Sequence, residues 1–171
     1  MLEEAAFAER RGAQSYGLVS GYASMSDARH LTAPDREGAG LMGAIQAAFS
    51  ESGLKRPGYI NAHGTGTPYN DVMETRAIKS AFGQSAYEIP ISSIKSMIGH
   101  SFGAGGAIEV AACLLAMRHG CLPPTINYQE KDADCDLDYV PLNARTIAIN
   151  SAMSLSAGFG GQNAAIVFEK T

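Results

Sequence analysis

The chain has 171 residues, of which 46% are apolar and 18% are charged, and its formal net charge is −4. This length is enough for one compact domain, and the composition is typical of a globular protein rather than a disordered one. The acidic balance argues against a protein that binds nucleic acid or an anionic membrane surface, because both kinds usually carry a basic face. No apolar run approaches the roughly 20 residues of a membrane span.

The N-terminus and the cysteines point to a reducing compartment. Residues 1–5 lack the basic and apolar regions of a secretory signal. The three cysteines, Cys113, Cys121 and Cys135, are odd in number and have no CxxC spacing, which disfavours a disulfide framework or a zinc site. We therefore expect a cytoplasmic protein.

Helical and extended patterns alternate along the chain. The periodicity predicts helices over residues 3–11, 38–52, 71–82 and 102–119, and strands over residues 16–25, 58–61, 89–94, 146–155 and 164–168. The segments 26–36 and 95–100 are predicted loops, and the glycine-rich segment 157–161 is a predicted hairpin turn. The alternation favours one sheet covered by helices, and the closing hairpin argues against a purely parallel sheet.

A strand–loop–helix unit occurs twice, and each copy carries a histidine shortly after its strand, His63 or His100. Ligands of open α/β sheets bind outside the carboxyl ends of the strands, so the two histidines are predicted to converge on one site. One alternative is a pair of loop histidines bonded to backbone groups. A metal site is disfavoured because the histidines are far apart in sequence and no third soft ligand is near. Neutral imidazoles at helix N-termini donate hydrogen bonds to a developing oxyanion, so the pair points to carbanion or enolate chemistry.

Three polar residues near the histidines have both a functional and a structural interpretation. Thr65 and Thr67 flank Gly66, and their hydroxyls would suit a ligand with amide or phosphate groups, although threonine and glycine are also ordinary turn residues. Lys95 precedes His100 by five residues and is either a site residue or a surface lysine. No P-loop and no complete GxGxxG motif is present.

Glu109 and the glycine-rich turn are the remaining candidates. Glu109 is the only charged residue between Lys95 and Arg118, on a helix that is apolar nearly all round and is therefore expected to be buried. A buried carboxylate needs a cation or hydrogen-bond donors, unless its side chain reaches the surface. The turn at Gly158–Gly161 presents backbone N–H groups with little side-chain cover, which suits an oxyanion hole or a gate as well as a tight hairpin.

Five motifs occur in a fixed order along the chain. They are Asn61–Pro68 (NAHGTGTP) with Asp71 and Glu74, Ser92–His100 (SSIKSMIGH), Pro123–Asn127 (PPTIN), Asp136–Pro141 (DLDYVP), and Gly158–Gly161 (GFGG) with Asn163. The ordered set resembles the β-ketoacyl-carrier-protein synthase II type of condensing enzyme, and the resemblance covers essentially the whole chain.

The resemblance implies a thiolase-like α/β fold of two similar halves. Each half has a mixed, mainly parallel five-stranded sheet with covering helices. Residues 1–37 would be the end of the first half with the connecting segment, and residues 38–171 would be the second half, closed by a C-terminal hairpin.

Individual residues match functional positions of that family. His63 and His100 match the catalytic histidines, which support decarboxylation of the malonyl thioester and stabilise the enolate. Lys95 matches an active-site lysine, and Glu74 matches an acidic residue that supports the lysine and a water network. Phe159 matches the gating phenylalanine, whose backbone N–H joins the oxyanion hole.

The resemblance also implies ligands. Thr65 and Thr67 match the threonines that bind the phosphopantetheine arm, which the acyl carrier protein presents, so no separate cofactor is required. Asn61, Glu109 and Ser154 match residues around a structural monovalent cation, Na⁺ or K⁺, of some members.

The family's nucleophile is a cysteine in the first half, and no such motif is present here. We therefore expect this chain alone to be inactive in condensation. The expected partners are the acyl carrier protein, the cysteine-bearing N-terminal half, and a second subunit in a homodimer or heterodimer. The expected activity of the whole enzyme is that of an acyltransferase, through decarboxylative Claisen condensation in fatty acid or polyketide biosynthesis.

Two other classes of protein compete with this interpretation. The first is a non-catalytic partner subunit similar to chain-length factors, which often lack the cysteine, although the intact His63 and His100 argue against it. The second is a thiolase, which is disfavoured because thiolases pair a histidine with a second cysteine. Gln162, Ala157 and Leu155 depart from the usual residues near the last turn, which is consistent with a polyketide-type or specialised acyl chain.

Overall fold

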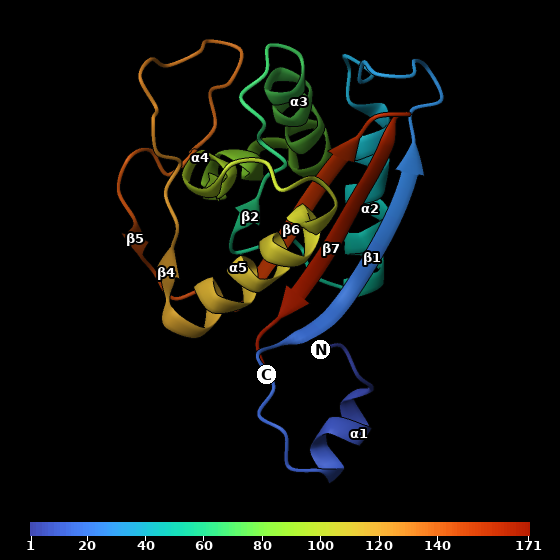
Figure 1. Ribbon diagram of the computed structural model, residues 1–171, viewed down its shortest axis with the longest axis vertical. Coiled ribbons are helices and arrows are strands. Elements are labelled where there is room, and N and C mark those ends of the chain that lie inside the picture. The colour runs from blue at the N-terminus through green and yellow to red at the C-terminus, as the bar shows by residue number, and fades with distance from the viewer.

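The computed structural model describes residues 1–171, and its elements alternate between helix and strand (Figure 1). The helices are α1 (Ala5–Arg10), α2 (Ala39–Ser52), α3 (Asn70–Phe82), α4 (Lys95–Ile98) and α5 (Gly105–His119), with 3-10 turns at Gly83–Glu88 and Phe102–Ala104. The strands are β1 (Leu18–Ser26), β2 (Ile60–Asn61), β3 (Ile91–Ser92), β4 (Cys121–Leu122), β5 (Arg145–Thr146), β6 (Ser151–Gly158) and β7 (Gln162–Glu169). None of the helices is long and apolar enough to cross a membrane.

Five strands form one mixed sheet in the order β1-β7-β6-β2-β3, and β4 pairs with β5 separately. Strand β7 runs antiparallel to both of its neighbours, whereas β6, β2 and β3 are parallel to one another. Four of the five strands therefore point the same way, which confirms the prediction of a mixed, mainly parallel sheet that ends in a hairpin. Strand β1, which comes from the predicted first segment, pairs with β7 near the C-terminus, with a register shift between Val19 and Gly21.

Helices cover both faces of the sheet, and each face has its own apolar core (Figure 1). Helices α2 and α3 pack on one face and α5 on the other. Successive strand residues alternate between the two cores, since Met153 belongs to the first and Ala152 to the second. This alternation follows from the two-residue period of a strand.

Spacing and glycines explain the position of α2. Its buried residues, Leu41, Ala44, Ile45, Ala48 and Phe49, recur at the spacing of one helix face. The helix ends at Gly53, whose φ of +69° suits glycine and whose N–H bonds to the Phe49 carbonyl. A Cβ at Gly21 would lie 2.0 Å from the Ala48 carbonyl oxygen, so glycine is needed for α2 to approach β1 this closely.

Three sequence predictions need correction. Residues 95–100 are not a simple loop, because they contain the four-residue helix α4, which is too short for its periodicity to be recognised. The predicted helix at 102–119 begins with a 3-10 turn and is α-helical only from Gly105. The predicted strand at 146–155 is divided between β5 and β6, and β6 extends to Gly158, so the hairpin turn is shorter than predicted.

Helix α5 is buried on one side only. Glu109 and Cys113 face the sheet, whereas Ile108 and Leu115 are 38% and 46% exposed. The prediction of a helix buried all round is therefore wrong, and α5 leaves an apolar face without a partner in this chain.

Candidate active site

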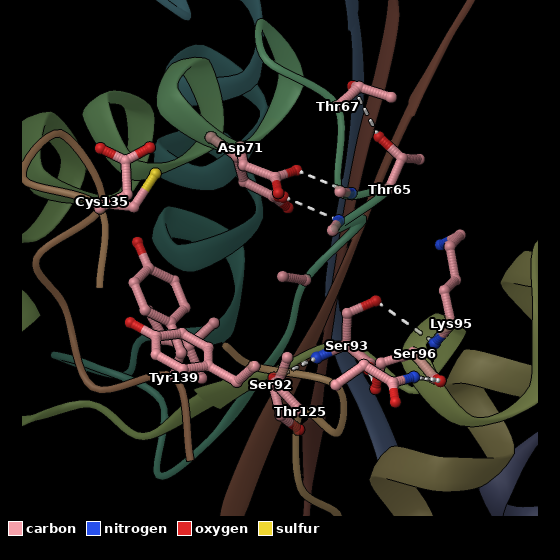
Figure 2. Close-up of a pocket in the computed structure, with 18 of the residues that line it drawn as sticks. Thr65, Thr67, Asp71, Ser92, Ser93, Lys95, Ser96, Thr125, Cys135 and Tyr139 are labelled. Atoms are coloured by element: carbon pink, nitrogen blue, oxygen red, sulfur yellow. Dashed lines mark hydrogen bonds between the residues drawn. The ribbon is translucent and has the colours of Figure 1, made fainter. Parts of the chain in front are cut away.

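The candidate residues gather where the parallel strands end. His63 follows β2, Lys95 begins α4 three residues after the end of β3, and Phe159 follows β6. A cavity of about 810 Å³ opens at this edge of the sheet, and Thr65, Thr67, Glu74, Lys95 and His100 are among the residues that line it. Figure 2 shows this cavity, with Thr65 and Thr67 on the loop after β2 and Lys95 at the start of α4. The two strand–loop–helix units therefore converge on one site, as predicted.

His63 and His100 lie next to each other. Their ring centroids are 5.6 Å apart, and the rings meet edge to face at 83°. The Phe102 N–H donates to Nδ1 of His100 at 3.1 Å, and Nζ of Lys95 lies 3.5 Å from Nδ1 of His63. An N–H group and an ammonium are donors only, so Nδ1 is the acceptor in both rings and Nε2 carries the proton. Both imidazoles can therefore donate a hydrogen bond through Nε2.

Lys95 forms a buried ion pair with Glu109 of α5. The two side chains are only 7% and 2% exposed. The second carboxylate oxygen of Glu109 accepts from the Ser156 hydroxyl at 3.4 Å. Glu109 is thus the buried carboxylate that the sequence predicted. Its partner is the ammonium of Lys95, and its side chain does not reach the surface. The lysine is not a surface residue.

Glu74 lies on α3 and contacts the loop that carries His63. Its buried carboxylate accepts from the backbone N–H of His63 at 2.7 Å and of Gly64 at 2.9 Å. The carboxylate that contacts Lys95 is that of Glu109. Glu74 therefore fixes the backbone of the loop that carries His63, from the neighbouring helix α3.

Thr65 and Thr67 form the rim of the cavity. Their hydroxyl oxygens are 3.0 Å apart, and the Gly66 N–H between them donates to Asp71 at 3.2 Å. Thr67 is exposed, Thr65 is half-buried, and both line the cavity, so their hydroxyls are accessible to a ligand. The loop is therefore bonded to α3 through Asp71, while its threonines line the cavity.

Phe159 lies on the exposed β6–β7 turn, with 81% of its surface accessible, and is not among the residues that line the cavity. The turn is held by the loop that follows β1. The Asp27 N–H donates to the Gly161 carbonyl at 2.8 Å, and the Gly160 N–H donates to the Leu31 carbonyl at 2.6 Å. Asn163 adds a bond from Nδ2 to the Asp27 carboxylate at 2.8 Å.

The contribution of Asp27 was not predicted from the sequence. The segment 26–36 has only the composition of a polar loop, and nothing in its spacing points to a turn more than 130 residues away. The motif residue Asn163 was the only available signal, because a buried amide must have a hydrogen-bond partner.

Asn61, Ser154 and Glu109 lie together between the sheet and α5. Asn61 and Ser154 are register partners on β2 and β6, and all three side chains are buried. Their oxygen atoms are of the kind that hard cations prefer. The Asn61 amide nitrogen has no hydrogen-bond partner, and the charge of Glu109 is already balanced by Lys95. No cluster of three or more histidine, cysteine or acidic side chains suits a metal ion.

Comparison with known proteins identifies the family. The profile described as "Beta-ketoacyl synthase, C-terminal domain" matches residues 16–129, which is more than half of the chain. The chain therefore belongs to the β-ketoacyl synthase family, as its five motifs predicted.

Relatives of both fatty acid and polyketide type are similar to this chain. It is 51% identical to the tetracenomycin polyketide synthase ketoacyl synthase alpha subunit of Streptomyces glaucescens, over 98% of this chain and 40% of that protein. It is also 51% identical to 3-oxoacyl-[acyl-carrier-protein] synthase 2 of Synechocystis sp., over 99% of this chain and 41% of that protein. The chain thus spans about two fifths of the length of these relatives.

A solved structure has the same fold. It is a type II polyketide ketosynthase in complex with its acyl-carrier protein, and it superposes with a TM-score of 0.96 at 40% identity, over 99% of this chain and 42% of that chain. The fold is therefore that of the thiolase-like ketosynthases.

The Lys95–Glu109 pair leads to a prediction about stability. Substitution Glu109→Gln would leave the buried Lys95 ammonium without its counter-charge, so we expect the free energy of unfolding to fall by about 3 kcal/mol. Urea denaturation would measure the change. The matched control is Glu88→Gln, which removes an exposed pair with Arg56 at 3.4 Å and should cost less than about 0.5 kcal/mol. Equal losses of unfolding free energy in the two variants would contradict the prediction that the buried pair contributes more to stability than the exposed pair.

Burial of His63 and Glu74 leads to a prediction about pH. Burial, with Lys95 and His100 nearby, lowers the pKa of His63 from 6.5 to about 4. As the pH falls from about 6.5 to 4, the unfolded chain therefore gains a proton first, and this group lowers the free energy of unfolding. Burial raises the pKa of Glu74 from 4.5 to about 7, although the N–H groups of Gly64 and His63 oppose this. As the pH falls from about 7 to 4.5, Glu74 therefore raises the free energy of unfolding, because the folded chain gains this proton first.

An NMR titration of the imidazole signals, assigned with His63→Gln, would test the first part of this prediction. We expect the His63 signals to titrate well below pH 6, and a midpoint near 6.5 would contradict it. Urea denaturation of His63→Gln across pH 4 to 6.5 should show a smaller fall in stability than the parent protein shows.

Proposed function

We propose that this chain supplies the two histidines of a β-ketoacyl synthase active site. The whole protein would be an acyltransferase that condenses malonyl-carrier protein with an acyl thioester in fatty acid or polyketide biosynthesis. The observation that carries the proposal is the contact between His63 and His100, each with Nδ1 facing a donor and Nε2 left to donate. Membership of the family and the names of the relatives support it.

The proposed reaction begins with decarboxylation. The bond between the malonyl carboxylate and the adjacent carbon breaks, CO₂ leaves, and the electron pair moves into the thioester carbonyl to form an enolate. Two Nε2–H donors directed at the enolate oxygen stabilise its charge, and a preorganised pair of this kind needs no proton transfer. The enolate carbon then attacks the carbonyl of the enzyme-bound acyl thioester, a carbon–carbon bond forms, and the cysteine thiolate leaves.

Lys95 supports the reaction through His63. Its ammonium holds Nδ1 of His63 as an acceptor. Burial and the nearby ammonium lower the pKa of His63 to about 4, so the imidazole stays neutral near pH 7. Glu109 keeps the lysine in place by the ion pair, and Glu74 keeps the His63 backbone in place. In this proposal His63 and His100 contact the reacting atoms, and the other three residues position them.

The malonyl group would arrive on a carrier protein. Each hydroxyl of Thr65 and Thr67 offers a donor and an acceptor at the cavity rim, which complements the amides of a phosphopantetheine arm. Support comes from the solved ketosynthase of the same fold, which is described in complex with its acyl-carrier protein. We assign Phe159 the role of gate, with its backbone N–H in the oxyanion hole.

The nucleophile would come from outside this chain. Cys113 is buried in α5, and burial raises its pKa. Cys135 lies on the opposite side of the cavity from Lys95 in Figure 2, and burial raises its pKa as well. Cys121 lies on β4, away from the strand ends that carry the histidines. The missing part of the site would be a cysteine-bearing N-terminal half, and the exposed apolar face of α5 is a surface for it to cover.

A bound monovalent cation and a dimeric assembly belong to the same proposal. Asn61, Ser154 and Glu109 would hold Na⁺ or K⁺ between α5 and the sheet, where the unpartnered Asn61 amide, with its two ends exchanged, would present an oxygen. The ion would add structural support, since Lys95 already balances the carboxylate. The whole protein would form a homodimer or heterodimer.

The second candidate function is a non-catalytic partner subunit of a ketosynthase heterodimer. Similarity to solved structures described as a ketosynthase with a chain length factor favours it. The ordered pair of histidines and the buried lysine argue against it, because a subunit without chemistry has no need of either.

Histidine variants of the whole protein separate the two candidates. Removal of one preorganised donor typically costs about 100- to 1000-fold in rate, so we expect His63→Ala and His100→Ala each to lower malonyl decarboxylation by that amount. The release of CO₂ from malonyl-carrier protein would be measured. His119→Ala, at the exposed end of α5, is the control and should keep the rate. Unchanged rates in both site variants would support the partner subunit.

The position of the cysteines leads to a separate prediction about this chain alone. An acyl thioester or an epoxide inhibitor should leave its intact mass unchanged under conditions that modify the protein with its cysteine-bearing half. Mass spectrometry with peptide mapping would identify any adduct. Rapid stoichiometric modification of Cys135 beside the cavity would contradict the proposal that the nucleophile lies elsewhere.

A further inference from the structure

Phe102 combines two properties that are unusual for an aromatic residue. Its backbone lies in the left-handed region, with a φ of +48°, which residues other than glycine rarely adopt. Its side chain is 81% exposed, so packing within this chain does not explain its presence. Gly103 follows directly, and a glycine at 102 would adopt the same φ without strain. Strained backbone that is not explained by packing is a reason to look for a role in the site.

Phe102 contacts His100 in two ways. Its N–H donates to Nδ1 of His100 at 3.1 Å. Its ring stacks on the imidazole, with centroids 4.9 Å apart and an angle of 16° between the planes. The left-handed backbone allows one residue to make both contacts, because it turns the chain back over the histidine two positions earlier.

The two histidines of the site are held differently. His63 is half-buried, its backbone is bonded to Glu74, and its ring lies beside Lys95. His100 is exposed, and the bond from Phe102 is the only hydrogen bond of its ring to the rest of the chain. A single hydrogen bond selects the tautomer but leaves the ring plane free to turn about that bond. A stacked ring restricts this rotation, because offset stacking favours parallel planes.

We propose that Phe102 is a positioning residue for His100, whose aromatic ring fixes the imidazole plane so that Nε2–H points at the enolate oxygen. The inference rests on the proposed function, since it assumes that His100 stabilises that oxygen. Phe102 would thus orient His100, in addition to the positioning roles proposed for Lys95, Glu74 and Glu109. The backbone N–H alone would set the protonated nitrogen, and the ring would set its direction.

The test compares three variants in the whole protein with its cysteine-bearing half. Phe102→Leu keeps the backbone N–H and removes the ring, Phe102→Tyr keeps the ring, and Phe7→Leu is the control at another exposed phenylalanine, on α1. Because misorientation of a catalytic group costs about ten- to a hundredfold in rate, we expect Phe102→Leu to lower kcat for malonyl decarboxylation by about tenfold or more, with KM changed less than about twofold. Phe102→Tyr and Phe7→Leu should stay within about twofold of the parent kcat.

NMR gives a readout that does not depend on activity. The ring current of a stacked phenyl group shifts the imidazole C–H signals of His100 upfield, so these signals should move downfield in Phe102→Leu and stay in place in Phe102→Tyr. A parent-like kcat in Phe102→Leu, an equal loss in Phe102→Leu and Phe102→Tyr, or unmoved His100 signals in Phe102→Leu would overturn the proposal. His100→Ala separates the two levels of inference, because full decarboxylation by that variant would instead overturn the proposed function.

Discussion

The buried contact between Lys95 and Glu109 is the interaction on which the site depends. It joins the segment after β3 to helix α5 across the sheet face, and both side chains are almost fully removed from water. A lysine in that position needs a carboxylate, and a carboxylate on an apolar helix needs a cation, so neither residue is tolerable without the other. The pair also brings the ammonium within 3.5 Å of His63, and this contact decides which nitrogen of that ring carries the proton.

The rest of the site holds the two imidazoles in place. Glu74 binds the backbone beside His63, and the Phe102 N–H binds the ring of His100. These contacts come from α3 and from the turn before α5, so the two histidines stand on loops whose ends are fixed by helices. Side chains held by such hydrogen bonds keep their orientation, and donors fixed in this way stabilise an oxyanion without having to reorganise.

The sheet, its mixed character and the gathering of the histidines were predictable because they follow from periodicity and from the rule that strand ends carry the ligand site. The pairing of Lys95 with Glu109 was predictable in part. The isolated carboxylate on an apolar helix indicated that a cation or donor must be near, but the sequence did not identify Lys95 as that cation. Helix α4 was missed because four residues carry no period. Glu74 and Asp27 act on backbone groups, and a backbone contact has no signature in residue type. The same holds for Phe102, whose backbone conformation is not visible in its sequence.

The hydrogen bonds between the loop after β1 and the β6–β7 turn change how this surface can be engineered. Residues 27–37 have the polar composition of a permissive loop, and Figure 1 shows them at the edge of the molecule beside the hairpin. Asp27 and Leu31 nevertheless bond to the backbone of Gly161 and Gly160, and Asp27 also accepts from Asn163. A peptide tag inserted between residues 27 and 37 would therefore disturb the far end of the chain. A chimaera between relatives therefore needs to exchange the loop at residues 27–37 and the β6–β7 turn together, although they are far apart in the sequence.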